Sequence, residues 1–263
     1  MSDQDLQAYQ PPKLPNVKKI KFSDVWAALL AGLRDFQKAP LLGMVFGGVY
    51  VVGGMLIMAA LTIYDMPWMI IPVATAFPLI GPFVAVGTYE VSRRLAANEP
   101  LVWREIFFLI LGQRERQLGW MAFVLLFILW IWIYQIRLLI ALFLGFKSFS
   151  SIGAFVGMVV TTPEGLGFFV VGTLVGAGIS FSLYAATVVA MPLLMVRDID
   201  FVSAIIVSFK SVRENFWPMI GFGLVVGVLT LLAMLPAFFG LLVVLPVLGH
   251  ATWHLYIRVV EQS

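Results

Sequence analysis

The two histidines of the sequence, His250 and His254, are the first residues whose type and spacing could carry chemistry. Four residues turn an α-helix by about 400°, so both imidazoles would lie on nearly the same face and could jointly hold a divalent metal ion. Carboxylates would have to complete such a site, and Glu90 is the first candidate, followed by Asp198 and Asp200. One interpretation is therefore a metal site formed by His250, His254 and Glu90.

Two other interpretations of the histidine pair stay open. Trp253 and Tyr256 stand beside it, which favours a hydrogen-bonded pair in the aromatic belt of a membrane interface. Proton handling is the other, because histidine titrates near neutral pH. Haem is disfavoured, since its two axial ligands come from opposite sides of the iron and neighbours on a single helix cannot supply both. We therefore expect no cofactor.

No motif of an enzyme accompanies the histidines. The sequence lacks a phosphate-binding glycine loop, an HExxH pair and a GxSxG nucleophile elbow. It also lacks cysteine, which excludes thiolate metal sites. The sequence therefore predicts a protein that is not an enzyme.

The composition is that of a membrane protein. Apolar residues make up 61% of the 263 residues and charged residues 12%, and the mean hydropathy is +0.99. Crossing a bilayer takes about 20 apolar residues in a helix. Such spans are predicted at 39–62, 68–88, 118–140, 166–195, 217–235 and 237–257. The expected fold is an all-α bundle of six membrane helices in a single domain, residues 22–263, preceded by a disordered cytoplasmic tail, residues 1–21.

The basic residues predict how these spans are oriented. Fifteen of the 17 lysines and arginines fall on one side of the six spans, and only Arg137 and Lys147 fall on the other. The richer side faces the cytoplasm, so both termini are expected there. The basic residues flank spans and form no separate polar domain, so a nucleic-acid partner has no support.

Two of the cytoplasmic segments resemble each other. Residues 24–34 align without gaps on residues 200–210, and a proline follows each segment, at Pro40 or Pro218. A third, weaker copy begins at Glu99. These segments predict three units, each an amphipathic surface helix followed by a membrane hairpin. Chance similarity between apolar sequences is the alternative.

Several local patterns inside the spans carry further predictions. Glycines four residues apart, at 43–47, 172–176 and 223–227, favour close helix packing within the chain over a dimer face. The third span is rich in aromatic residues and poor in glycine, so we expect it outermost against lipid. Thr162, Pro163 and Glu164 are typical of a helix start. Ser180, Ser182 and Tyr184 form the only polar stripe at mid-membrane depth.

Four stretches carry a resemblance to a known family: GTYEVSRR at 87–94, TPEG at 162–165, MPLLMVRDID at 191–200 and PVLGHATWHLY at 246–256. Over nearly its whole length the chain resembles a proteobacterial family of predicted integral membrane proteins, catalogued as a domain of unknown function. Members are sometimes labelled cytochrome c oxidase subunit I. That label conflicts with this sequence, because the subunit needs six histidines for its haems and copper. The resemblance implies a multi-pass protein of the bacterial inner membrane without an assigned reaction.

Three classes of function follow from these observations. The first is an accessory, assembly or scaffold protein of an inner-membrane complex, such as a respiratory complex, with the lipid bilayer as its other partner. The second is a channel or transporter for a small solute. The third is a metal-dependent activity at the cytoplasmic face.

Overall fold

The computed structural model describes residues 14–63, 70–112, 117–145 and 152–262. Its regular secondary structure over these ranges is helical, apart from an isolated bridge between Val17 and Val260. The helices are α2 Phe22–Lys38, α3 Pro40–Thr62, α4 Ile70–Ala97, α5 Trp103–Gly112, α6 Gln117–Phe143, α7 Ile152–Thr161, α8 Pro163–Thr187, α9 Ala190–Val196, α10 Phe201–Glu214, α11 Phe216–Met234 and α12 Leu241–Val259.

Helices lie at each of the predicted spans, and the all-α membrane class is confirmed. Within the described ranges, four segments are long and apolar enough to cross a membrane: Gly119–Phe143, Pro163–Val196, Phe216–Met234 and Leu241–Val259. A fifth is added if α2 and α3, which meet at 104°, count as one broken span. The count of six spans stays a prediction.

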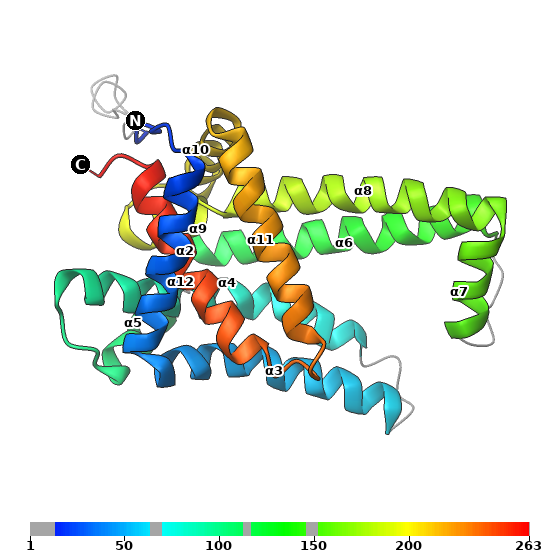
Figure 1. The fold of residues 1–263 in the computed structure, drawn as a ribbon, viewed down its shortest axis with the longest axis horizontal. Coiled ribbons are helices and arrows are strands. Elements are labelled where there is room, and N and C mark those ends of the chain that lie inside the picture. The colour runs from blue at the N-terminus through cyan, green and yellow to red at the C-terminus, as the bar shows by residue number, and fades with distance from the viewer. Residues whose placement is uncertain (1–13, 64–69, 113–116, 146–151, 263) are drawn as a thin grey trace, which may run out of the picture.

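One end of the molecule is a compact assembly of helices that we call the base. It consists of α2, α5, α9, α10, residues 84–97 of α4 and residues 246–259 of α12, and it lies on the side of both chain termini (Figure 1). Its core joins Ala28, Tyr89, Leu193, Val207 and Leu255, which come from five different helices and are each at most 5% exposed. The base therefore ties distant parts of the chain into one packed unit.

Helices α2 and α12 cross at close range inside the base. A Cβ atom at Gly32 would lie 2.5 Å from the backbone nitrogen of Ala251 and 2.6 Å from the carbonyl oxygen of Val247. Only glycine lets two helix backbones come this near. At the start of α2 the Asp24 carboxylate accepts a hydrogen bond from the Lys21 amide. The helix ends at Lys38, and Ala39 is its C-cap, just before Pro40.

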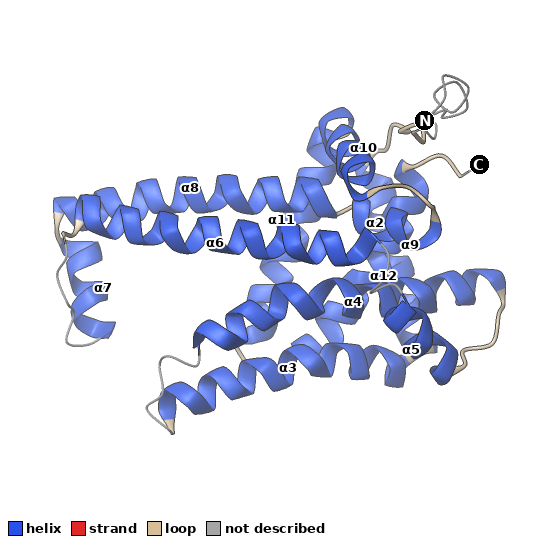
Figure 2. Cartoon of the chain, turned by 180° about the vertical axis from the view of Figure 1, so that it is seen from behind, coloured by secondary structure: helices blue, strands red, loops and turns tan. Residues whose placement is uncertain are grey.

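Helices α6, α7 and α8 form a second region, which we call the arm. Helices α6 and α8 run side by side away from the base, and α7 folds back at the tip (Figures 1 and 2). The predicted helix start at the tip is confirmed: Thr162 Oγ1 accepts a hydrogen bond from the Gly165 amide, Pro163 is the first helical residue, and Glu164 lies in the first turn. The arm thus has a defined end of its own.

Residues 14–21 correct the predicted tail of residues 1–21. They lie extended along the end of α12, where the Lys18 amide donates to the Val259 carbonyl at 2.7 Å. The Asn215 side chain accepts from the Ile20 amide and donates to the Lys18 carbonyl. The polar composition suggested disorder. The segment is ordered because its backbone groups form hydrogen bonds with residues far away in the sequence. Residues 1–13 lie outside the described residues.

The three glycine pairs have different surroundings. A Cβ atom at Gly47 would lie 2.8 Å from the Leu241 carbonyl oxygen of α12, which confirms close packing within the chain for this pair. Gly223 faces the Tyr184 ring, whereas Gly227 has open space. On α8, Gly172 meets only one Leu139 methyl group at 3.9 Å, and Gly176 meets nothing within 4 Å. The glycine face of the arm is therefore unoccupied by the described residues.

Candidate functional site

His250 lies at the crossing of α4 and α12, in the middle of the base. It is fully buried, and its Nδ1 atom is 2.8 Å from Ser92 Oγ, which is buried as well. Its Nε2 atom is buried and has no hydrogen-bond partner among the described residues. Gly249 permits this approach, because a Cβ atom there would collide with the Thr88 side chain. The imidazole therefore links α12 to α4 through its hydrogen bond with Ser92.

His254 lies one turn further along α12 and faces α2 instead. Its Nε2 atom is 2.7 Å from Asp35 Oδ2, and Asp35 is only 6% exposed. The backbone carbonyl of His254 accepts a hydrogen bond from Arg258. The two histidines thus fasten α12 to two different helices, and both are hydrogen-bonded as one of the three interpretations predicts.

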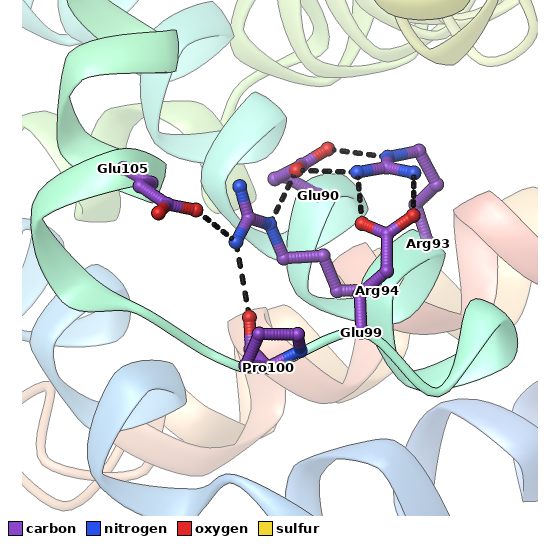
Figure 3. A network of polar contacts seen from close by, with 6 residues as sticks. All are labelled: Glu90, Arg93, Arg94, Glu99, Pro100 and Glu105. Carbon is purple, nitrogen blue, oxygen red and sulfur yellow. Dashed lines mark hydrogen bonds and ion pairs between the residues drawn. The ribbon is translucent and has the colours of Figure 1, made fainter.

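Glu90 is the centre of an ionic network at the end of α4 (Figure 3). Its buried carboxylate accepts from Arg93 Nε at 2.8 Å and from Arg94 Nε at 2.7 Å. Arg93 also forms an ion pair with Glu99. Arg94 forms one with Glu105 at the start of α5, with 2.7 Å between Arg94 Nη1 and Glu105 Oε2. A carboxylate this deeply buried is stable only with such paired and hydrogen-bonded charges. The network joins α4, the following loop and α5.

Backbone contacts of the loop after α4 support the same network. Asn98 adopts a left-handed conformation with φ of 54°, and the Glu99 amide donates back to the Arg94 carbonyl, which closes the helix. Arg94 then donates to the Pro100 carbonyl at 3.0 Å. Hydrogen bonds from Arg93 lower the pKa of the Glu99 carboxyl. The chain reversal is therefore held by both backbone and side-chain contacts.

The three residues of the predicted metal site are not brought together. Glu90 pairs with two arginines, His250 with Ser92, and His254 with Asp35. Asp200, the more distant candidate, caps α10 by accepting from the Ser203 amide. Over the part of the chain that the structure describes, no group of three or more histidine, aspartate or glutamate residues is placed to hold a metal ion.

Two residues of this centre, Asp35 and Ser92, were missed by sequence reasoning. A signal for Asp35 existed: it lies on the same face of α2 as Ala28 and Gly32, which is the face that small residues mark for close packing. A carboxylate on such a face needs a partner from another element. Ser92 carried no comparable signal, since serine is common in every environment.

The arm carries a different kind of candidate site. A groove of about 490 Å³ runs between α6 and α8 and is lined mainly by Trp132, Leu139, Phe168, Gly172 and Gly176. Nearly all of its lining is apolar, in line with a position inside the membrane. Elsewhere on α8, Ser182 donates to the Gly178 carbonyl and Tyr184 donates to the Met219 carbonyl. Two of the three members of the predicted polar stripe are therefore bound to the backbone.

Comparison with known proteins gives one match. Residues 70–196 match the family model described as predicted integral membrane protein (DUF2189). No curated protein and no solved structure matches the chain. The matched residues include the Glu90 network and the whole arm. Residues 70–196 are thus similar to a family of predicted integral membrane proteins of unknown function, in agreement with the resemblance seen in the sequence.

Proposed function

We propose that the protein is a non-enzymatic accessory or scaffold protein of a complex in the bacterial inner membrane, and that the arm binds a membrane helix of its partner. In this proposal the base is the rigid platform at the cytoplasmic face. A respiratory complex is one candidate for the assembly it serves.

The observation that carries this proposal is the exposure of the arm. Only 6% of the most apolar stretch of α6 is buried inside the protein. Exposed aromatic residues follow one another along this helix, among them Phe127, Trp130 and Tyr134, each more than half exposed. Apolar exposure alone suits contact with lipid. Contact with lipid requires neither a groove nor open glycines. The groove and the open glycines on α8 form a shaped surface on which another helix backbone can lie close.

The polar groups of the base support a structural use over a catalytic one. Glu90, Asp35 and His254 each have a fixed partner from within the chain. A channel has less support, because a conducting path needs free polar groups along it, and Ser182 and Tyr184 are bound to backbone carbonyls.

The repeat of surface helix plus hairpin is part of the proposal. Asp24 and Asp200 each stand 15 residues before a break in the helix, at Ala39 or Asn215. The breaks have similar backbone angles, with φ and ψ of −135° and 56° at Ala39 and −123° and 40° at Asn215.

Residues that align between the two copies are also buried to a similar extent. Ala28 and Ala204 are both fully buried, and Phe46 and Phe222 are at most 3% exposed. The corresponding break of the third copy, near residue 114, lies outside the described residues. The matching breaks and burial support two equivalent units, and with them six spans in three hairpins.

The proposed topology places both termini in the cytoplasm. The pairing of Val17 with Val260 supports a common side for the two end segments, and the basic residues support the cytoplasm as that side. Reporter fusions at residues 65, 96, 150, 205, 236 and 263 should alternate between outside and inside, starting outside. A single reversal among the internal fusions would contradict six spans.

The function is tested by purification from native membranes in a mild detergent, followed by mass spectrometry. A stoichiometric membrane partner should copurify with the wild-type protein. The double variant Gly172→Leu, Gly176→Leu should lose it while keeping its melting temperature, because the new side chains project into open space.

A matched control is Gly227→Leu on α11, which is equally open but lies outside the groove. This variant should keep the partner. If the wild type has no stoichiometric partner, or if both variants retain it, docking on the arm is wrong.

A further inference from the structure

A second groove lies where α10 meets two membrane spans. It has a volume of about 610 Å³ and runs between the end of α8, the length of α10 and the start of α11. Its walls are apolar and include Phe181, Ile205, Phe209 and Phe216. Several of these are open to the outside, with Phe209 and Phe216 each 44% exposed. A groove of this size falls in the range of about 300–1,000 Å³ that holds small ligands.

Two cations stand at this groove without an ion-pair partner among the described residues. Lys210 and Arg213 both line it and lie three residues apart on α10, which puts them on one face of the helix. Both are exposed, and neither forms an ion pair with any residue that the structure describes. The lining contains no aspartate or glutamate. The groove thus combines an apolar floor with two unbalanced positive charges.

The two spans beside the groove show which of its ends lies toward the membrane. Helix α8 is a candidate span that passes Phe181 before it reaches Ala185, and α11 is a candidate span that starts at Phe216. Helix α10, between them, is a surface helix of the base. Phe181 therefore marks the membrane side of the groove, and the last turn of α10, with Arg213, marks the level of the lipid headgroups.

From this juxtaposition we infer that the groove binds one anionic glycerophospholipid, whose phosphate contacts Lys210 and Arg213 and whose acyl chain lies against Phe181 and Phe216. A zwitterionic lipid would add a cationic amine to a site that already has two uncompensated cations. An anionic headgroup balances them and is attracted by each basic residue at the interface. This site is separate from the partner groove of the arm and does not depend on the proposed function.

Native mass spectrometry of the full-length protein in mild detergent tests the inference, by titration with dioleoyl phosphatidylglycerol or dioleoyl phosphatidylcholine. The first phosphatidylglycerol should bind more tightly than the first phosphatidylcholine. Each basic residue near the surface is expected to contribute about fivefold in affinity. The double variant Lys210→Gln, Arg213→Gln should therefore bind phosphatidylglycerol about 25-fold more weakly and phosphatidylcholine unchanged.

The matched control is Arg34→Gln, Lys38→Gln, which removes two exposed cations from another surface helix, α2, away from the groove. It should leave phosphatidylglycerol binding unchanged. An equal loss in both double variants would mean unspecific charge attraction and would overturn the site. So would equal affinity of the wild type for the two lipids.

A third variant, Ile206→Trp, fills the groove from an exposed position without changing charge. It should weaken the binding of both lipids, and it keeps the test decisive if the charge variant folds poorly. Unchanged phosphatidylglycerol binding in this variant would exclude the groove as the binding place of the acyl chain.

Discussion

The base and the arm differ in how their glycines and large side chains pack. In the base, glycines bring backbones together and buried charges find fixed partners, as Gly32 does against α12 and Glu90 against Arg93 and Arg94. In the arm, the glycines of α8 face open space and the aromatic residues of α6 point outward. The same residue types are thus packed within the chain in the base and exposed in the arm.

The largest effect is expected from filling the glycine contact of the base. Gly32→Leu should lower the free energy of unfolding by more than about 3 kcal/mol, because the side chain would collide with the backbone of α12. Gly176→Leu in the arm should change it by no more than about 1 kcal/mol, since nothing lies within 4 Å and leucine favours a helix. Thermal unfolding in detergent measures both. Similar losses in the two variants would remove the distinction between base and arm.

The next effect concerns the charge at the centre of the network. Glu90→Gln should cost about 3 kcal/mol of unfolding free energy, because Arg93 and Arg94 would lose a buried counter-charge. Glu99→Gln is the control within the same network and should change the melting temperature much less, since this carboxylate is exposed to solvent. Chemical denaturation of the two variants compares them. A larger loss for Glu99→Gln would place the centre of the network elsewhere.

A smaller effect is expected where α2 joins α12. Asp35→Ala removes the partner of the largely buried His254 and should cost about 2 kcal/mol. Asp35→Asn should recover part of this loss, because an amide still offers one hydrogen bond to the imidazole. Melting temperatures of both variants decide the point. If alanine and asparagine destabilise equally, the hydrogen bond contributes nothing at this crossing.

The smallest effect concerns a helix cap of the base. Asp200→Ala should cost about 1 kcal/mol at neutral pH, because α10 loses its N-cap. Hydrogen bonds from Ser203 lower the pKa of Asp200, so this stabilisation is complete above the ordinary carboxyl pKa of 3.8 and is lost as the pH falls through the lowered value.

Melting curves of wild type and Asp200→Ala should therefore converge only in acid. Thr162→Ala, the matching cap at the tip of the arm, should affect global unfolding less, because the end of α8 can fray while the base stays folded. A difference between wild type and Asp200→Ala that persists undiminished well below pH 3.8 would exclude the carboxylate as its source.

Local features of this molecule could be predicted from the sequence, and long-range ones could not. The helices follow from apolar runs, and the cap at Thr162 follows from neighbouring residues in the chain. The pairing of Glu90 with Arg93 and Arg94 is equally local, because the two arginines lie three and four residues away on the same helix.

Asp35 and Ser92 were not recognised as partners of the histidines, since 219 and 158 residues separate each pair. The docking of residues 14–21 was missed for the same reason. In each case the partner is chosen by tertiary packing, which a single sequence without related sequences does not reveal.

The contact between the two ends of the chain has a consequence for how the protein is made. Helix α2 is synthesised first among the described helices, yet its glycine face is covered by α12, and residues 16–18 bond to residues 259–261. Gly32 and Asp35 on α2 therefore stay without these partners until α12 has been synthesised. Assembly of the base therefore follows the synthesis of α12, and a nascent chain stopped before α12 leaves the packing face of α2 uncovered.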